Sequence, residues 1–282
     1  MGGRPTLRAA SSPIRSLAVL AIALTMGLTA VGMTAVGMTP AALAAPAQPG
    51  ACTAPMQGRY AVMTMGTVKE QQRTSPTASL RQERWLPGGV ISGELTERVG
   101  RSSRSATYQG TVTLVGTCLV RLERQLPWGR QVSEAVLDGK GRPLYSLDRG
   151  AGTVITGRWL PMAPGSCKAA DLNGTVLSSQ VGMNGQNGGW TPNAVVQREQ
   201  WRDGSVQGVA LASNNGVGET VGYSGRLTLD ANGCWGNLTE RDTKGVAYNY
   251  RALIVKGRAG ARGYFYLQSD PADLTVGWLV RD

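Results

Sequence analysis

The sequence predicts an all-β protein made of two tandem eight-stranded antiparallel up-and-down barrels, with one disulfide in each barrel. Apolar and polar residues alternate with a period of two between turn signals such as Asn-Gly and Asp-Gly, a pattern typical of half-buried strands. The sequence also repeats itself once, and its four cysteines fall two in each copy. A pair of β-sandwiches is the alternative architecture for the same series of short strands.

Residues 1–44 have the features of a secretory signal peptide. Arg4, Arg8 and Arg15 precede a long apolar segment without any acidic residue, and Ala42-Leu43-Ala44 matches the small-residue pattern that signal peptidase cleaves. A retained membrane anchor is the alternative, because the apolar segment approaches the length needed to span a bilayer. Cleavage after Ala44 predicts a periplasmic or secreted protein with no transmembrane segment after processing.

The internal repeat defines the predicted domains. Segments recur at spacings of 115 to 117 residues: 82–85 as 198–201, 108–114 as 223–229, and Glu123-Arg124 as Glu240-Arg241. We therefore expect one barrel over residues 45–161, a linker over 162–166 and a second barrel over 167–282.

The four cysteines allow three pairings. The repeat favours Cys52–Cys118 and Cys167–Cys234, because this pairing places one bridge in each copy and closes two loops of nearly equal length. A bridge that closes a loop of this size contributes about 4 kcal/mol in the chain-entropy model. Disulfides also agree with an oxidising compartment outside the cytoplasm.

The alternation predicts eight strands in each repeat. In the first repeat they cover residues 58–66, 79–86, 90–99, 105–115, 118–126, 130–137, 143–148 and 152–160. In the second they cover 174–182, 194–201, 205–213, 219–229, 234–242, 246–256, 261–269 and 274–280. Closure into a barrel removes the edge strands that invite aggregation. The glycine-rich segment 185–189 is interpreted as a flexible hairpin loop.

The composition argues against most kinds of catalysis. The chain has no histidine, which removes the commonest general base and metal ligand. Paired cysteines are not nucleophiles, and the acidic residues lack the spacing of a calcium loop. We therefore assign no catalytic residue, no metal site and no cofactor from the sequence.

Two Glu–Trp pairs are the first candidates for a binding site. Glu83 and Trp85, like Glu199 and Trp201, are two residues apart, so each pair shares one face of its strand. If the Trp points into the barrel, the Glu is buried as well, and it needs a cation, hydrogen-bond donors or a raised pKa. The alternatives are an outward-facing pair or a structural ion pair with Arg124 or Arg241.

Tyr108 and Tyr223 complete the set of candidate ligand-binding residues. Each shares a predicted interior face with the apolar residues that follow it across Gly110 or Gly225, namely Val112, Leu114, Leu227 and Leu229. The glycines would let a neighbouring group approach the backbone closely. A tyrosine here could donate a hydrogen bond to a ligand, or it could be a core residue with a satisfied hydroxyl.

The remaining aromatic residues suggest a binding surface less directly. Seven Trp and eight Tyr accompany a single Phe. Trp128 and Trp190 fall in predicted turns, where an exposed Trp is typical of recognition surfaces. Packing over the open end of a barrel would explain them equally well.

The charge is distributed unevenly between the repeats. The whole chain has a formal net charge of +11. Residues 46–165 carry 15 basic and 8 acidic residues, whereas residues 166–282 carry 11 and 10. The first repeat could therefore contact an anionic envelope surface while the second acts as a spacer, although arginines on solvent-facing strands would give the same excess. The basic residues are scattered, without the aromatic-interleaved patch of a nucleic-acid-binding protein.

The element Tyr-x-Gly-x-Val/Leu-Thr-Leu, present at residues 108–114 and 223–229 before Cys118 and Cys234, resembles one found in small exported bacterial proteins of the calycin-like kind. These barrels are related in architecture to lipocalins, avidins and allene oxide cyclase. The Gly-x-Trp signature of lipocalins is absent, because the first strand reads Gly58-Arg59-Tyr60. The resemblance implies a barrel with an interior cavity and transfers no functional residue.

Three function hypotheses remain open from the sequence. The favoured one is a non-catalytic module that binds a small apolar or amphipathic ligand or a protein partner. The second is a structural, envelope-associated protein with a filled core. The third is a cyclase- or isomerase-like enzyme that uses the interior Glu and Tyr. A cavity favours the first hypothesis, a filled interior the second, and a desolvated carboxyl group the third.

Overall fold

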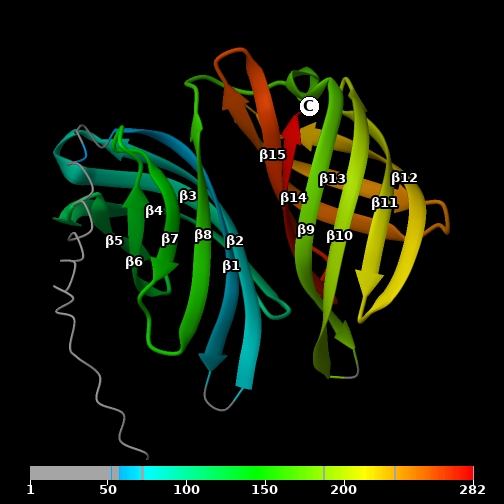
Figure 1. The fold of residues 1–282 in the computed structure, drawn as a ribbon, viewed down its shortest axis with the longest axis horizontal. Helices are drawn as coiled ribbons and strands as arrows, with labels where there is room; N and C mark the ends of the chain where they lie inside the picture. Colours follow the sequence, from blue (N-terminus) through cyan, green and yellow to red (C-terminus); the bar gives the residue numbers. More distant parts are fainter. Residues whose placement is uncertain (1–51, 53–56, 71–72, 187, 232, 282) are drawn as a thin grey trace, which may run out of the picture. The chain divides into compact units, whose positions relative to one another are not determined.

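The computed structural model describes residues 52, 57–70, 73–186, 188–231 and 233–281. These residues form sixteen β-strands and two short 3-10 helices, η1 (Pro87–Gly89) and η2 (Ala169–Leu172) (Figure 1). The predicted signal peptide lies outside the described residues. Within the described ranges, no helix is both long and apolar enough to cross a membrane.

The first eight strands form a closed antiparallel barrel in which each strand pairs with the next and β1 also pairs with β8. These strands are β1 (Gly58–Glu70), β2 (Arg73–Leu86), β3 (Val90–Val99), β4 (Ser102–Gly116), β5 (Leu119–Leu126), β6 (Gly129–Leu137), β7 (Pro143–Asp148) and β8 (Thr153–Met162).

The other eight strands form a second closed barrel with the same order, closed by the pairing of β9 with β16. They are β9 (Gly174–Gln186), β10 (Gly189–Arg202), β11 (Ser205–Asn214), β12 (Val217–Leu229), β13 (Trp235–Asp242), β14 (Ala247–Gly257), β15 (Gly260–Gln268) and β16 (Asp273–Arg281). The predicted architecture is confirmed, and the β-sandwich alternative is wrong because both sheets close.

The first hairpin of each barrel is longer than predicted. The ladder between β9 and β10 continues to the pair Gln186 and Gly189, so most of the segment interpreted as a flexible hairpin loop belongs to the two strands. Trp190 consequently lies in a strand and not in a turn. Backbone hydrogen bonds continue beyond the last clear apolar–polar alternation, which is why the sequence pattern ended these strands too early.

Both predicted disulfides are present. Cys52 bonds to Cys118 with a Cα–Cα distance of 5.2 Å, and Cys167 bonds to Cys234 with a distance of 4.8 Å. The bridges join positions 66 and 67 residues apart, so each constrains the unfolded chain to a similar extent.

Alternate residues of each strand fill the barrel interiors. In β5, for example, Val120, Leu122 and Arg124 are buried, whereas their neighbours face outward. Large aromatic side chains occupy one end of the first interior: the ring centroids of Tyr60, Trp85 and Trp159 are 5.3 to 5.9 Å apart. This end is therefore closed by packing.

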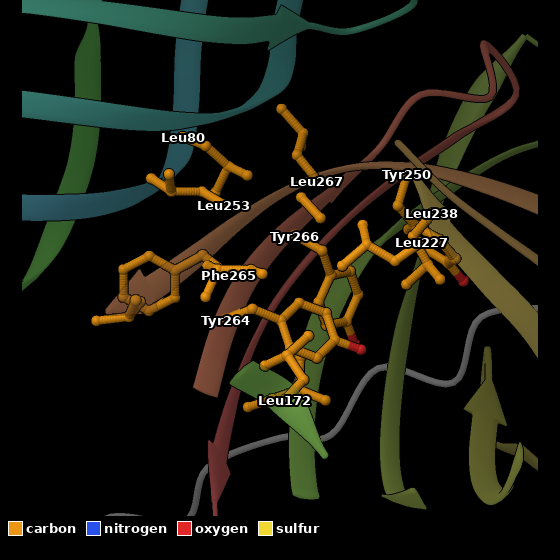
Figure 2. Close-up of a cluster of buried hydrophobic side chains, with 14 of the residues drawn as sticks. Leu80, Leu172, Leu227, Leu238, Tyr250, Leu253, Tyr264, Phe265, Tyr266 and Leu267 are labelled. Atoms are coloured by element: carbon orange, nitrogen blue, oxygen red, sulfur yellow. The ribbon is translucent and has the colours of Figure 1, made fainter. Parts of the chain in front are cut away.

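Apolar and polar contacts join the two barrels. Leu80, on the outer face of β2, belongs to the same buried cluster as Leu253 of β14, and Figure 2 shows these two side chains beside each other. Arg98 of β3 donates from Nη1 to the carbonyl oxygens of Gln268 and Asp270, at 3.0 and 2.5 Å. The first barrel thus holds the turn that connects β15 to β16.

Candidate functional site

The structure brings Glu83, Trp85 and Tyr108 together inside the first barrel. Glu83 Oε2 accepts a hydrogen bond from Trp85 Nε1 at 3.2 Å, and Oε1 accepts one from the Tyr108 hydroxyl at 3.0 Å. The ring of Tyr108 lies over Gly93, where a Cβ atom would come within 2.5 Å of it. Gly93 therefore allows the tyrosine to reach the glutamate, a role that the sequence analysis missed.

Arg124 neutralises this glutamate. Its Nε donates to Glu83 Oε1 at 2.6 Å, its Nη2 donates to Oε2 at 3.2 Å, and its Nη1 donates to Ser133 Oγ at 2.7 Å. The two charged side chains are 2% and 0% exposed. Burial acts to raise the pKa of Glu83, but Arg124 reverses that effect and holds the pKa below its ordinary value. The predicted structural ion pair with Arg124 is thus present.

The second barrel assembles the corresponding three residues. Glu199 Oε2 accepts from Trp201 Nε1 at 2.6 Å, and Oε1 accepts from the Tyr223 hydroxyl at 3.0 Å. Tyr264, whose contact has no counterpart among the described residues of the first barrel, donates to Oε2 at 2.9 Å. Tyr223 lies over Gly208 in the same way that Tyr108 lies over Gly93.

No arginine faces Glu199 in the part of the chain that the structure describes. In the first barrel, Arg124 pairs with Gly110 across β4 and β5, and in the second the residue opposite Gly225 is Glu240. Gly110 and Gly225 correspond because a Cβ at either would collide with the neighbouring strand, 2.1 Å and 2.5 Å from a carbonyl oxygen. Glu240 therefore occupies the position of Arg124.

The expected match between Glu123-Arg124 and Glu240-Arg241 is consequently wrong by one residue. Arg241 is exposed and donates to the carbonyl oxygen of Gly245 at 2.5 Å, so it is not the partner of Glu199. The turn between β12 and β13 contains one residue more than the turn between β4 and β5, so residues of β5 and β13 correspond at a spacing of 116. The dipeptide recurs at a spacing of 117, one position further along the strand, so its two side chains point to the opposite faces.

Two buried carboxyl groups thus share the interior of the second barrel. Burial raises the pKa of Glu199 to about 7, against the effect of its three hydrogen-bond donors. Burial raises the pKa of Glu240 well above its ordinary value, and the charge of Glu199 raises it further. Glu240 accepts no hydrogen bond from the described part of the chain, so no donor opposes this effect and its surroundings favour the protonated carboxyl group.

Two further arginines of the first barrel are replaced in the same manner. Arg81 lies two residues before Glu83, and the corresponding residue before Glu199 is Gln197. Arg104 lies four residues before Tyr108, and Glu219 lies four before Tyr223.

The arginines of the first barrel complete a neutral network. Arg104 pairs with Glu97 at 2.7 Å. Arg81 donates to Gln131 Oε1 at 2.6 Å, and Gln131 in turn donates to Asp148 at 2.6 Å. Every charge of this interior therefore has a direct or bridged partner among the described residues.

The replacements open a cavity in the second barrel. The space at this end of the first barrel is about 210 Å³, and at the same end of the second barrel it is about 390 Å³. Among the described residues, the lining of the larger cavity contains no Lys or Arg. Its polar lining consists of Gln180, Asn184, Asn193, Gln197, Asn214, Glu219, Tyr223, Glu240, Asp242, Tyr248, Tyr250, Gln268, Asp273 and Thr275.

The floor of the cavity is aromatic and apolar. The rings of Tyr250 and Tyr266 are 5.1 Å apart in an edge-to-face arrangement, and Tyr264 and Tyr266 extend from the same face of β15 (Figure 2). Trp201, Leu227 and Leu238 are buried in the same apolar cluster as these tyrosines. The cavity is therefore open towards one end of the barrel and closed at the other.

The other sequence-based candidates lie outside this cavity. Trp128 lies in the turn after β5, with the guanidinium of Arg104 4.1 Å from its ring centroid. Trp190 packs against the apolar cluster of the second barrel. Leu114, expected in the first interior, is 54% exposed because β4 becomes irregular there. No cluster of three acidic or cysteine residues suited to a metal ion occurs in the described ranges.

We predict that Arg124→Met lowers the free energy of unfolding by about 3–5 kcal/mol, because it leaves the Glu83 charge buried without its cation. Urea unfolding measures this change. The control, Arg121→Met, alters an exposed arginine on the outer face of the same strand and should have little effect. The double variant Glu83→Gln/Arg124→Met should recover part of the loss. Equal effects of the two single variants would contradict a buried ion pair.

The second barrel should respond to pH in the opposite sense from the first. A carboxyl group whose folded pKa is raised stabilises the protein below its ordinary pKa of 4.5, and this contribution is lost as pH rises through about 7. Glu83, with a lowered pKa, instead loses its contribution as pH falls through that lowered value. The free energy of unfolding of the second barrel should therefore decrease between about pH 5 and about pH 8.

Glu240→Gln tests this pH dependence. Removing one titrating group should reduce the slope of unfolding free energy against pH by up to about 1.4 kcal/mol per pH unit. Glu134→Gln is the control, because Glu134 is partly exposed on the outer face of the first barrel, where it pairs with the exposed Arg149. The same slope for wild type and Glu240→Gln in urea titrations would refute the coupling of the two carboxyl groups.

Comparison with known proteins adds little to this picture. No protein-family model matches the sequence, and no curated protein matches it. Among solved structures, a candidate AttH protein from Nitrosomonas europaea aligns over 84% of this chain and 99% of its own, with 10% sequence identity and a TM-score of 0.27. A match this weak indicates neither a shared function nor a shared arrangement of the barrels.

Proposed function

We propose that this protein is an exported, non-catalytic small-molecule-binding protein and that its second barrel holds the ligand. One observation carries the proposal: Gln197, Glu219 and Glu240 stand where the first barrel has three arginines, and a cavity of about 390 Å³ remains there. This volume falls in the range of small-molecule sites.

The two barrels have different roles in this proposal. The interior of the first is filled by a neutral network and serves stability, whereas the second is the binding domain. This assignment replaces the hypothesis that the second repeat is a spacer. It also changes the expected ligand, because a lining rich in Asn, Gln, Tyr and carboxyl groups favours a polar or amphipathic molecule over a purely apolar one.

We further propose a periplasmic or secreted location. The signal-peptide pattern of residues 1–44 and the two disulfides agree with passage into an oxidising compartment. A relationship with calycin-like barrels belongs to the same proposal, since those barrels also use an interior cavity.

Acid–base catalysis is a second candidate function, favoured by the Glu199–Glu240 pair. A carboxyl group with a pKa of about 7 can give and take a proton at neutral pH, as a cyclase or isomerase requires. The two candidates differ in the fate of the bound molecule: an isomerase changes the connectivity of its substrate during incubation, whereas a binding protein returns its ligand unaltered.

Native mass spectrometry of the mature chain, incubated with a mixture of polar metabolites, tests the binding proposal. We expect a one-to-one complex that Ala210→Leu abolishes, because this substitution fills the cavity with the side chain that the first barrel has at Leu95. Val209→Leu, on the outer face of the same strand, should retain the complex. The proposal would be contradicted if the Ala210→Leu variant still formed the complex. It would also be contradicted if neither the wild type nor the variants bound any metabolite.

A further inference from the structure

The cavity of the second barrel is acidic in a protein that is basic as a whole. Glu219, Glu240, Asp242 and Asp273 all contribute to its lining, and within the described part of the chain no Lys or Arg does so. Lys244 pairs with Glu219 from the solvent side, where both side chains are more than one-third exposed. The electrostatic potential inside the cavity therefore favours a positive charge.

Glu240 is the acidic group that lacks a partner. It is only 4% exposed, yet among the described residues it accepts no hydrogen bond and forms no ion pair. Asp242, by contrast, accepts hydrogen bonds from the backbone N–H groups of Lys244 and Val246, at 2.9 and 2.8 Å. A buried carboxyl group without donors is costly unless something else supplies them, and in this barrel the space beside it is the cavity.

Aromatic rings line the same cavity as Glu240. Tyr223, Tyr248 and Tyr250 line the cavity, and the ring of Tyr266 packs against that of Tyr250. The faces of aromatic rings attract cations, particularly organic ammonium groups. The cavity is also far larger than a bare ion, so an occupant that fills it has carbon groups as well as charge.

We propose that the second barrel binds a small organic ammonium ion, whose charge lies beside Glu240 and whose carbon groups contact the tyrosine rings. The inference rests on the proposed binding function and specifies the chemical class of the ligand. The first barrel does not bind such an ion, because Arg124 already occupies the equivalent position beside Glu83. When the ammonium ion binds, the proton held by Glu240 is released to solvent.

Isothermal titration calorimetry of the mature protein with choline as the probe tests this inference. The matched control ligand is the neutral alcohol in which a tert-butyl group replaces the trimethylammonium group, so that size and shape are kept while charge is removed. We expect choline to bind at least about tenfold more tightly than the alcohol. Its affinity should rise between about pH 5 and about pH 8, with an enthalpy that depends on the buffer because protons are released.

Matched variants separate the charge of the site from its shape. Glu240→Gln should weaken choline binding at least about tenfold and leave binding of the neutral alcohol unchanged. Glu134→Gln, on the outer face of the first barrel and away from the cavity, should change neither affinity.

Several outcomes would overturn the inference. Equal affinity for choline and the alcohol would show that the cavity does not select a cation, and so would choline binding that is unchanged in Glu240→Gln. If Ala210→Leu nevertheless abolished binding, the cavity would still be supported as the binding site. Competition by stoichiometric Ca²⁺ would identify a metal site instead. Absence of choline binding overturns the ammonium assignment, and if native mass spectrometry also finds no complex, the proposed function fails with it.

Discussion

The residue that faces the buried glutamate determines what each barrel interior can contain. In the first barrel this residue is Arg124, which satisfies both oxygens of Glu83 and bonds to Ser133. A buried ion pair of this kind is tolerated because its geometry and additional hydrogen bonds offset the cost of desolvation. In the second barrel the facing residue is Glu240, so two carboxyl groups share one site and neither is neutralised. The second interior also lacks the long arginine side chains that fill the corresponding space in the first barrel. A cavity remains in their place.

The surrounding framework is nearly the same in both barrels. In each, a Trp two residues beyond the Glu and a Tyr lying over a Gly donate hydrogen bonds to the carboxylate. These donors favour an ionised glutamate, but without an arginine they do not offset burial completely, which is why the pKa of Glu199 remains raised to about 7. The fold therefore does not depend on the ion pair itself. One repeat therefore has a filled, neutral interior, whereas the other has a cavity at the same place.

Much of the fold could be predicted from the sequence because its determinants are local. Alternation, turn residues and cysteine spacing predicted the sixteen strands and both disulfides. They also placed each Glu on the same face as its Trp, but left open whether that face points into the barrel. The pairing of Glu199 could not be predicted correctly, because sequence identity aligned Arg241 with Arg124. In a strand, a shift of one residue reverses the direction of a side chain, and only the observed register between β12 and β13 places Glu240 inside.

The cavity itself was also beyond sequence analysis. It is formed by side chains from all eight strands of the second barrel. Its origin becomes clear only when these side chains are compared, position by position, with those of the first barrel. Gly93 and Gly208 illustrate the difficulty: each permits a tyrosine from the next strand to cross it, a contact that involves residues 15 positions apart and leaves no periodic signal.

The charge of the buried glutamates is the central claim, and carbon-13 NMR of the side-chain carboxyl groups measures it most directly. Spectra of the mature protein would be recorded across pH, with Glu83, Glu199 and Glu240 assigned from their Gln variants. The account predicts that at about pH 6 Glu83 is ionised and Glu240 is protonated, although they occupy comparable depths in two barrels of the same fold. An ionised Glu240 at this pH, or a Glu83 that titrates above the ordinary pKa of 4.5, would contradict it.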